Sequence, residues 1–419
     1  MTEGVRTLYV CYFGLREPLV YTQVLPYLRE LADGGVHVCL LTFEPDLRKH
    51  WNSESIAEWK GRLARQGIQW YLMAYHRRPS LPVTLYDIAA GAWRAAAIAR
   101  REQINIFHGR SHVGATIAML ARRLHGGRVI FDMRGFLAEE YIDSGRWKAN
   151  GYVPKLVKSV ERWLCRSADG IVVLTLRLRE MVSAEASARG RPIEVIPCCV
   201  DPSRFTASSV DREQVRHELG VSDRLVCVHS GSMGGTYDAA STAAFVEAAR
   251  AADPRVFALV LTPSEPAAIA GEFDRAGLSA RDYRVLHSPP QDVPRYLAAA
   301  DVGLALARPG FARCATSPTK VGEYLAAGVP VLATAGIGDL DSRLERAGVG
   351  VLLPRLDRAA FTAAFAAVQA LRADPDLGER CRHEARVHYD LRTVGGPRYR
   401  RLYAALSAYA ALARAMTQS

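Results

Sequence analysis

Apolar segments of strand length alternate with helical segments along most of this chain, and this alternation restricts the fold more than any other feature. The segments are apolar without interruption, as in TLYVCYF at residues 7–13, instead of alternating between apolar and polar residues. Such strands between helices indicate a parallel sheet that helices cover on both faces. The expected strands are 7–13, 36–43, 68–75, 104–109, 128–133 and 169–175 in the first half, and 224–231, 256–262, 283–288, 302–307, 329–334 and 350–353 in the second.

Two domains are expected, because 419 residues exceed what a single hydrophobic core usually holds. A Pro-rich segment followed by a polar one interrupts the alternation near residues 200–215. We therefore expect an α/β protein of two Rossmann-like, doubly wound domains, residues 1–205 and 206–390. The last segment, about 391–419, is expected to be helical and to cross back over the first domain. Open α/β sheets bind ligands beyond the carboxyl ends of their strands, so function is expected in a cleft between the domains.

The positive charge of the chain is concentrated in its first half. Residues 1–200 carry 28 Lys and Arg against 19 Asp and Glu, a net charge of +9, whereas residues 201–419 carry 26 against 24, a net charge of +2. Such a half can face nucleic acid, an anionic membrane or an anionic substrate, or it can simply be an Arg-rich solvated surface. The basic and aromatic segment RYRRLY at 398–403 lies on the expected terminal helix, where packing explains it. No nucleic-acid partner is therefore expected.

Several other classes of site and segment are not expected. The eight cysteines have neither the spacing of a zinc site nor that of a disulfide framework, so no metal site is predicted. The opening MTEGVRTLYV lacks the pattern of a signal peptide, and no run of about 18 apolar residues could span a bilayer. A cytoplasmic location is expected.

The segment SPTKVGEYLAAGVPVLAT, residues 317–334, places a lysine and a glutamate at the start of an apolar helix. Ser317 and Pro318 are expected to cap and begin this helix, which puts Lys320 and Glu323 in its first two turns. Free amides at a helix start favour an anion such as phosphate, and a carboxylate further in can accept hydrogen bonds from ribose hydroxyls. The pattern indicates a nucleotide site, although a Lys–Glu pair on the helix surface explains it equally well.

This segment resembles the donor-binding signature of retaining glycosyltransferase family four, which has the GT-B fold. VIFDMRG, ERWLCRSADGIVVLT, HSGSMGGTYD and DVPRYLAAADVGLAL resemble other segments of the same family in the same order. The resemblance covers nearly the whole chain. It implies a nucleotide-sugar donor, expected to be a UDP-sugar, on the second domain and no other cofactor. It also implies an acceptor on the first domain, which could be a glycan, a lipid-linked saccharide or a small molecule.

Two departures from the family pattern affect the donor site. Glu323 matches the second Glu of the family's E-x7-E motif, which binds the ribose, but Ala315 stands where the first Glu would be. The Arg and Lys that often follow the first donor-domain strand are absent from residues 231–236. Glycine amides, Arg308, Arg313 and Lys320 are the expected substitutes. The expected donor-binding residues are Gly14, Ser230, Gly231, Ser232, Gly234, Gly235, His287, Arg308, Ser317, Pro318, Thr319, Lys320 and Glu323.

On the acceptor side, the expected catalytic residues are Asp132, Arg134 and His112. The resemblance places Asp132 and Arg134 among the family's acceptor-side polar residues, where they could orient a hydroxyl and meet a phosphate. His108, Arg110 and His112 end the preceding strand. A histidine such as His112 could act as a base there, although a histidine at a strand end is more often structural.

The sequence thus favours a retaining, metal-independent glycosyltransferase, in which front-face attack on the donor requires no enzyme nucleophile. Because a basic acceptor domain suits an anionic membrane, the acceptor is expected to be a lipid-linked or cell-envelope glycan, with the enzyme peripheral on the inner membrane face. The alternatives are glycosylation of a soluble metabolite and an inactive, glycosyltransferase-like partner subunit, which Ala315 and the GSMGG loop would suit. A nicotinamide-dependent oxidoreductase is disfavoured, because G-x-G-x-x-G is absent after the first strand.

Overall fold

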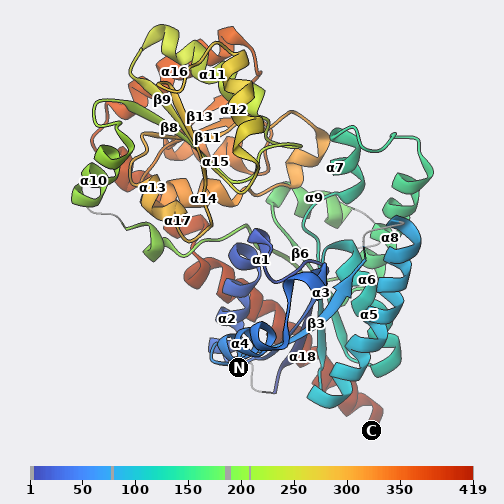
Figure 1. Cartoon of the computed structure of the whole chain (residues 1–419). Coiled ribbons are helices and arrows are strands. Elements are labelled where there is room, and N and C mark those ends of the chain that lie inside the picture. Colours follow the sequence, from blue (N-terminus) through green and yellow to red (C-terminus); the bar gives the residue numbers. More distant parts are fainter. Residues whose placement is uncertain (1–3, 77–79, 185–189, 207–208, 419) are drawn as a thin grey trace. The chain divides into compact units, whose positions relative to one another are not determined.

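The chain folds into two compact units, each of which contains one sheet (Figure 1). The computed structural model describes residues 4–76, 80–184, 190–206 and 209–418. Unit 1 consists of residues 1–197 together with 394–419, and unit 2 of residues 198–393. The divisions fall at 197/198 and 393/394, which are eight and three residues from the expected ones at 205/206 and 390/391. The terminal segment belongs to unit 1, as the sequence predicts.

Unit 1 contains a seven-stranded sheet in the order β3-β2-β1-β4-β5-β6-β7, and all of its pairings are parallel. The strands are β1 (Arg6–Cys11), β2 (His37–Pro45), β3 (Ile68–Tyr75), β4 (Ile106–Arg110), β5 (Arg128–Asp132), β6 (Gly170–Val173) and β7 (Ile193–Val195). The central strands are buried along nearly their whole length, because helices cover both faces. The expected parallel, covered sheet is confirmed.

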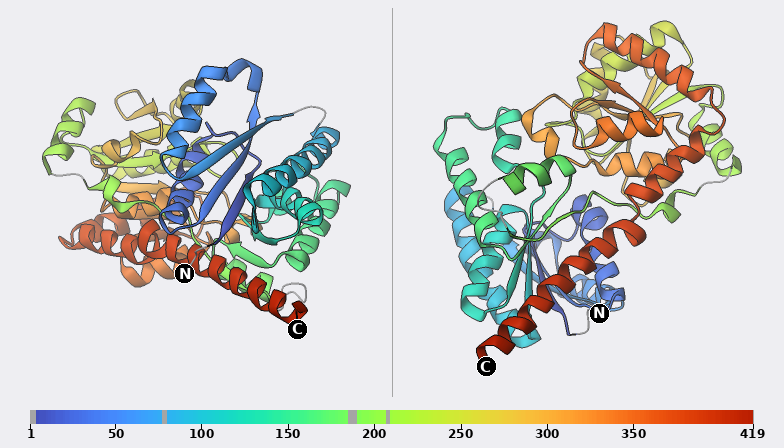
Figure 2. Two further views of the ribbon diagram at one scale, coloured as in Figure 1. Left: turned by 90° about the horizontal axis from the view of Figure 1, so that it is seen from below. Right: turned by 180° about the vertical axis from the view of Figure 1, so that it is seen from behind.

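Helices flank this sheet on both sides, and the chain's last helix lies against it as well (Figure 2). The helices of unit 1 are α1 (Pro18–Gln23), α2 (Leu25–Asp33), α3 (Leu47–His50), α4 (Ser53–Ala64), α5 (Ser80–Glu102), α6 (Ser111–His125), α7 (Leu137–Asp143), α8 (Tyr152–Ser167), α9 (Leu176–Ala184) and α18 (Gly396–Gln418). Helix α18 packs on α2 and β7. Its Tyr403 hydroxyl lies 3.1 Å from Thr7 Oγ1 and 2.8 Å from His108 Nδ1, so it is joined to the centre of the sheet.

Unit 2 repeats the same winding with six parallel strands in the order β10-β9-β8-β11-β12-β13. The strands are β8 (Leu225–Ser230), β9 (Val256–Thr262), β10 (Tyr283–His287), β11 (Val302–Ala305), β12 (Val331–Thr334) and β13 (Gly350–Leu353). The helices are α10 (Ser209–Leu219), α11 (Ala239–Ala252), α12 (Pro266–Arg275), α13 (Val293–Leu297), α14 (Thr319–Ala326), α15 (Leu340–Ala347), α16 (Arg358–Arg372) and α17 (Leu377–His388). Short turns of other helix types lie at η2 (Pro202–Phe205), η3 (Phe311–Ala315) and η4 (Leu391–Gly395). Both sheets are therefore doubly wound, as expected.

A glycine in β11 determines how closely α14 approaches the sheet of unit 2. A Cβ atom on Gly303 would lie 2.2 Å from the ring of Tyr324, so only glycine leaves room for this fully buried side chain. The Tyr324 hydroxyl accepts a hydrogen bond from the backbone N–H of Ser230, at 2.8 Å. Helix α14 is thereby fixed to the carboxyl end of β8.

All eight cysteines are buried and none forms a disulfide. Among the described residues, none of the helices is both long enough and apolar enough to cross a membrane.

Candidate functional site

Helix α14 begins without the side-chain cap that the sequence predicts. Pro318 occupies the N-cap position, and no side-chain hydrogen bond caps the helix there. Ser317 instead accepts a hydrogen bond from the backbone N–H of Cys198 through its Oγ, at 3.1 Å. The prediction of a Ser317 cap is therefore wrong, because this hydroxyl ties the helix start to another segment. Thr319 is the first helical residue, so Lys320 lies in the first turn as expected.

Lys320 is buried, with only 8% of its surface exposed. Its Nζ lies 3.1 Å from His229 Nε2 and 3.7 Å from the centre of the Tyr237 ring. Within the described residues, no carboxylate forms an ion pair with this ammonium group. Burial lowers the pKa of Lys320 from 10.5 to about 7, and Glu323 opposes the shift only in part. The site thus holds a cation without the anionic partner that a buried charge normally has.

The two aromatic neighbours of Lys320 are both uncharged. Burial and the nearby lysine hold the pKa of His229 well below its usual value, so its ring is neutral. A neutral ring that accepts a hydrogen bond at Nε2 must carry its proton on Nδ1. Burial raises the pKa of Tyr237, which keeps this phenol protonated. These groups orient the ammonium without neutralising it, so an anion can still bind there.

Glu323 lies one turn further along α14 and is half-buried. Burial raises the pKa of its carboxyl, while Arg204, Lys320 and a hydrogen bond with Ser230 oppose that shift. The residue is therefore partly exposed to solvent, and the charge of Lys320 acts on its carboxyl. From this position it can accept hydrogen bonds from hydroxyl groups of a ligand.

A glycine-rich loop, residues 231–235, follows β8 directly beside Lys320. Gly231 has a φ angle of +108°, which favours glycine, and a Cβ atom there would lie 3.6 Å from Lys320 Nζ. Ser232, Gly234 and Gly235 are exposed. Met233, which packs against the core, is the one large side chain of this loop, so a ligand can approach the backbone at the glycines closely.

Three other expected donor residues of unit 2 lie around this loop or at a neighbouring strand end. Arg308 has a side chain that is 60% exposed, and its Nε donates a hydrogen bond to Asp238 Oδ2 at 2.9 Å. Arg313 is buried and donates to Thr236 Oγ1 at 2.6 Å. His287 is exposed at the carboxyl end of β10. Arg308 can thus reach a ligand, whereas Arg313 supports the loop.

In unit 1, Asp132 is completely buried at the end of β5, within a cluster of polar side chains. Tyr9 donates a hydrogen bond to Asp132 Oδ2 at 3.1 Å, and Arg134 Nη1 lies 3.4 Å from Oδ1. Arg110 and His108 are 3.6 and 3.7 Å from Oδ2. Burial alone would raise the pKa of Asp132, but Arg134, His108 and Arg110 together hold it well below its usual range. Asp132 therefore remains ionised among basic partners.

Among the contacts of the described residues, none joins His112 to the Asp132 cluster. His112 is the second residue of α6 and is buried, and its Nε2 lies 2.9 Å from Glu161 Oε2 on α8. This pair joins two helices, which fits the structural role that the sequence left open. Gly14 follows β1 and is buried; a Cβ atom there would lie 2.7 Å from Pro45 and 2.9 Å from Glu44. Close packing inside unit 1 is thus sufficient to require glycine at this position.

Comparison with known proteins relates the first half of the chain to one domain family and the whole chain to one fold. Residues 20–199 match the family described as glycosyl transferase 4-like domain. Sucrose-phosphate synthase from Thermosynechococcus elongatus covers 96% of the chain over 100% of its own length, with a TM-score of 0.70 and 17% identity. Anabaena HepE in complex with UDP and glucose has the same coverage and TM-score at 14% identity. Residues 20–199 are therefore similar to this glycosyl transferase 4-like domain family, and the chain as a whole has the fold of these glycosyltransferases.

Two further proteins are similar to the whole chain or to part of it. WaaG, a glycosyltransferase involved in lipopolysaccharide biosynthesis, covers 93% of the chain over 97% of its own length, with a TM-score of 0.64 and 16% identity. The 2-deoxystreptamine glucosyltransferase of Streptomyces kanamyceticus is 41% identical over 66 residues, which are 16% of this chain and 17% of that relative. The GT-B fold expected from the sequence is confirmed.

Some residues of the candidate site around Lys320 were not singled out by the sequence. His229, Tyr237 and Arg204 surround Lys320 and Glu323, but they come from three separate segments. Only His229 could have been identified from the sequence, because it lies two residues before the glycine loop. In unit 1, Tyr9 was also missed. It is a single tyrosine inside an apolar strand, so nothing distinguishes it from a core residue.

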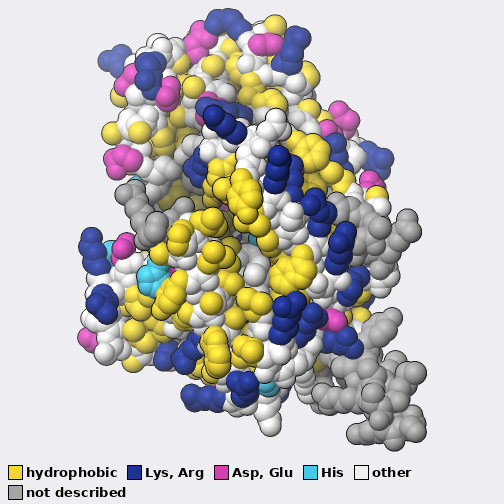
Figure 3. Space-filling view, turned by 90° about the vertical axis from the view of Figure 1, so that its right-hand side faces the viewer, with side chains coloured by type: hydrophobic (Ala, Val, Ile, Leu, Met, Phe, Trp, Pro, Cys, Tyr) yellow, Lys and Arg dark blue, Asp and Glu magenta, His cyan; other side chains and the backbone are white. Residues whose placement is uncertain are grey.

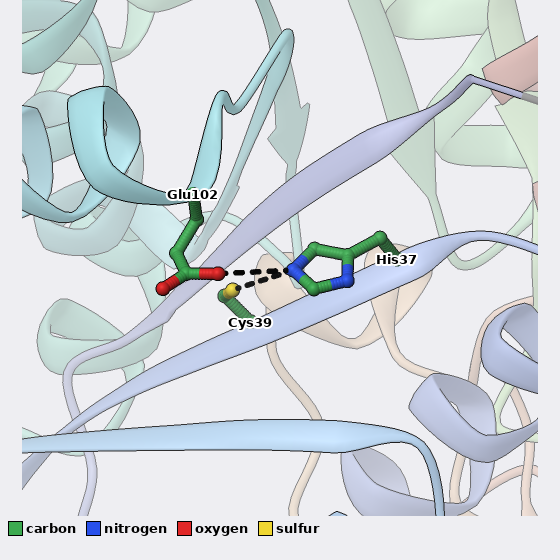
Figure 4. Close-up of side chains that lie close together, drawn as sticks. All are labelled: His37, Cys39 and Glu102. Atoms are coloured by element: carbon green, nitrogen blue, oxygen red, sulfur yellow. Dashed lines mark hydrogen bonds and ion pairs between the residues drawn. The ribbon is translucent and has the colours of Figure 1, made fainter.

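One group of residues with metal-ligating atoms lies elsewhere, at the amino end of β2 (Figure 4). His37 Nε2 lies 3.3 Å from Glu102 Oε2 and 3.6 Å from Cys39 Sγ. Glu102 also has Arg101 at 3.3 Å and Arg6 at 4.0 Å. Burial, followed by the charge of Glu102, raises the pKa of the Cys39 thiol to about 12. With two guanidinium groups already beside the carboxylate and a protonated thiol, these residues fit a hydrogen-bonded cluster better than a metal site.

Proposed function

We propose that this chain is a retaining, metal-independent glycosyltransferase, which moves a sugar from a nucleotide-sugar donor to an acceptor hydroxyl. The observation that carries the proposal is Lys320, a buried cation whose neighbours are neutral and whose open side faces a glycine loop. A diphosphate supplies the missing negative charge. HepE, which shares the fold, binds UDP and glucose, and this favours a UDP-sugar.

The donor would bind with its diphosphate at Lys320 and the amides of residues 231–235, and its ribose at Glu323. During transfer, the bond between the anomeric carbon and the diphosphate oxygen breaks as the acceptor oxygen bonds to the same face of that carbon. The acceptor's proton passes to the leaving phosphate. Lys320 and the exposed Arg308 stabilise the negative charge that develops on the diphosphate, which is the task that a metal ion performs elsewhere.

Asp132 and Arg134 are the proposed acceptor-side groups of unit 1. Asp132 is buried and ionised, so its role is to hold Arg110 and Arg134 in place rather than to exchange a proton. Arg134 is only partly buried and is the member of this cluster that an acceptor can reach. We propose a positioning role for Asp132 and a contact with a phosphate or hydroxyl of the acceptor for Arg134.

Two acceptor classes have support. A lipid-linked or cell-envelope glycan, reached from the cytoplasmic face of an anionic membrane, suits the net charge of +9 on residues 1–200. The relative named as a 2-deoxystreptamine glucosyltransferase favours a soluble small molecule instead. Transfer assays with 2-deoxystreptamine and with a lipid-linked saccharide, each with the nucleotide sugar that binds, distinguish the two.

The donor site is tested by calorimetric titration of UDP, UDP-glucose, GDP, ADP, CMP and dTDP into the wild type and into Glu323→Ala. We expect one nucleotide family to bind and the variant to bind it at least about tenfold more weakly, because a ribose contact is lost. Glu345→Ala is the matched control, since Glu345 is an exposed glutamate of the same unit. Absence of binding by every nucleotide would contradict the proposal and favour an inactive partner subunit.

The mechanism is tested on the product. Nuclear magnetic resonance of the product should show the donor's anomeric configuration, and the rate should be unchanged by a chelator. An inverted product would contradict retention, and loss of activity that added divalent metal restores would contradict metal independence.

A further inference from the structure

The outer face of α5 in unit 1 is apolar although it faces solvent. Leu81, Leu85, Ala89, Trp93 and Ala97 follow one another at i, i+4 spacing, so they form one stripe along the helix, and all five are exposed. Leu85 is 58% exposed and Trp93 is 68% exposed. A helix on the surface of a globular domain normally carries polar residues on this face.

The neighbouring helices extend this apolar stripe. Helix α6 packs against both α5 and α8, so the three form one layer on the sheet of unit 1. Leu124 on α6 and Tyr152 and Leu156 on α8 are exposed large apolar residues of this layer, and Tyr152 is 75% exposed. Figure 3 shows hydrophobic side chains gathered on this side of unit 1 between Lys and Arg side chains. We call the exposed surface of α5, α6 and α8 the three-helix face.

The charged groups of the three-helix face have one sign. Among the described residues of these helices, every charged side chain in the exposed class is basic: Arg94, Arg100, Arg101, Arg123, Lys155, Arg162 and Arg166. The acids of the same helices are turned inward and paired. Asp87 contacts Tyr12 and His76, Glu102 contacts Tyr71 and His37, and Glu161 contacts His112.

We propose that the three-helix face docks on an anionic membrane surface. Apolar side chains enter the boundary of the acyl chains, and the rings of Trp93 and Tyr152 suit the interface, where one end is apolar and the other wet. Arginine and lysine side chains lay their stems along the apolar surface and reach lipid phosphates with their charged ends. A second copy of this face fits less well, because it would bring basic groups against basic groups.

This inference names the surface by which the proposed enzyme would reach an acceptor held in a membrane. The test needs neither donor nor acceptor, so its failure would leave the proposed transferase activity standing. The full chain is sedimented with vesicles of phosphatidylcholine alone and of phosphatidylcholine mixed with phosphatidylglycerol, at low and at high salt. We expect binding to the mixed vesicles only, and weaker binding at high salt.

Two double variants separate the apolar and electrostatic contributions. Leu85→Ser with Trp93→Ser should lower the partition coefficient on mixed vesicles at least about tenfold, because two large side chains no longer enter the lipid. Arg94→Gln with Arg123→Gln should lower it about fivefold for each charge removed. Val387→Ser is the matched control, since Val387 is an isolated apolar residue, 46% exposed, on α17 of unit 2. Thermal unfolding checks that each variant is folded.

Three results would overturn the proposal. One is a wild type that does not bind mixed vesicles, and another is a Leu85→Ser, Trp93→Ser variant that binds them as the wild type does. The third is a concentration-dependent dimer that the same double variant abolishes, which would assign the three-helix face to a second copy of the chain.

Discussion

Each unit has a buried charged side chain at the carboxyl end of its sheet, but the two charged groups have different partners. In unit 1, the carboxylate of Asp132 is surrounded by Tyr9, Arg134, Arg110 and His108. In unit 2, the ammonium of Lys320 has a neutral histidine and a tyrosine ring as its closest partners. The buried carboxylate of unit 1 already has positively charged partners, whereas the buried ammonium of unit 2 has no negatively charged partner among the described residues.

This difference in partners indicates a structural role for the buried Asp132 and a ligand-binding role for the buried Lys320. Desolvation opposes both charges, yet the pKa of Asp132 falls because three basic groups compensate, while the pKa of Lys320 falls because little compensates. A protein tolerates an uncompensated buried charge mainly where a ligand completes it. The comparison therefore favours the proposed anion binding in unit 2 more strongly than the proposed catalytic role of unit 1.

The largest effect on stability is expected from removing Asp132 from its cluster of basic partners. Asp132→Ala leaves Arg110 buried beside a neutral side chain, so the free energy of unfolding should fall by about 3–5 kcal/mol. Chemical denaturation measures this change. Asp33→Ala, which removes an exposed aspartate of the same unit, should change it by less than about 0.5 kcal/mol. Equal effects of the two variants would show that the Asp132 network is not structural.

Removing Lys320, whose buried charge has no negatively charged partner in the described part of the chain, should have the opposite effect on stability. Lys320→Met should lower kcat/KM at least about 100-fold, because the diphosphate loses its buried cation. The unfolded chain binds more protons than the folded chain between about pH 7 and pH 10.5, so wild-type stability should rise with pH in this window. The variant should lack that rise and should be the more stable protein below pH 7. A variant less stable than the wild type at pH 6 would contradict the view of Lys320 as an uncompensated charge.

A smaller effect is expected from moving the helix that carries Lys320. Gly303→Ala brings a methyl group into the Tyr324 ring, which should cost about 1–3 kcal/mol of stability and displace α14 from β8. Donor affinity should fall together with stability, as measured by calorimetry. Combining it with Tyr324→Leu should restore part of the stability, and failure of this rescue would mean that the ring is not the obstacle.

The smallest effect is the pH dependence of donor binding. Binding a diphosphate favours protonated Lys320 and raises its pKa, so a proton is taken up above about pH 7. The Kd should therefore increase with pH above 7, by at most about tenfold per pH unit. Calorimetry in buffers of different ionisation enthalpy measures the uptake. Lys320→Arg stays charged, so it should bind without this pH dependence if Lys320 is responsible.

The sequence predicts the architecture well, because uninterrupted apolar strands occur almost only in covered parallel sheets. It also places Lys320 and Glu323, whose spacing from the helix start is local. It does not predict the partners of Lys320, because His229 lies in β8 and Tyr237 lies in the connection between β8 and α11, and both reach Lys320 only through tertiary packing. Nor does it separate His112 from Asp132. Ser111, with a φ angle of +57°, turns the chain directly from β4 into α6, and His112 faces α8.

Because all eight thiols are buried, their reaction with a thiol reagent measures how often each unit opens. Cys11, Cys39 and Cys165 lie in unit 1 and the other five in unit 2, so a thiol reagent reacts with either set only when that unit opens. Peptide mapping of the labelled sites then gives two opening rates from one sample. A nucleotide that binds at Lys320 would slow labelling of the unit 2 cysteines and leave labelling of the unit 1 cysteines unchanged. The native cysteines can therefore be used to detect donor binding without an introduced probe.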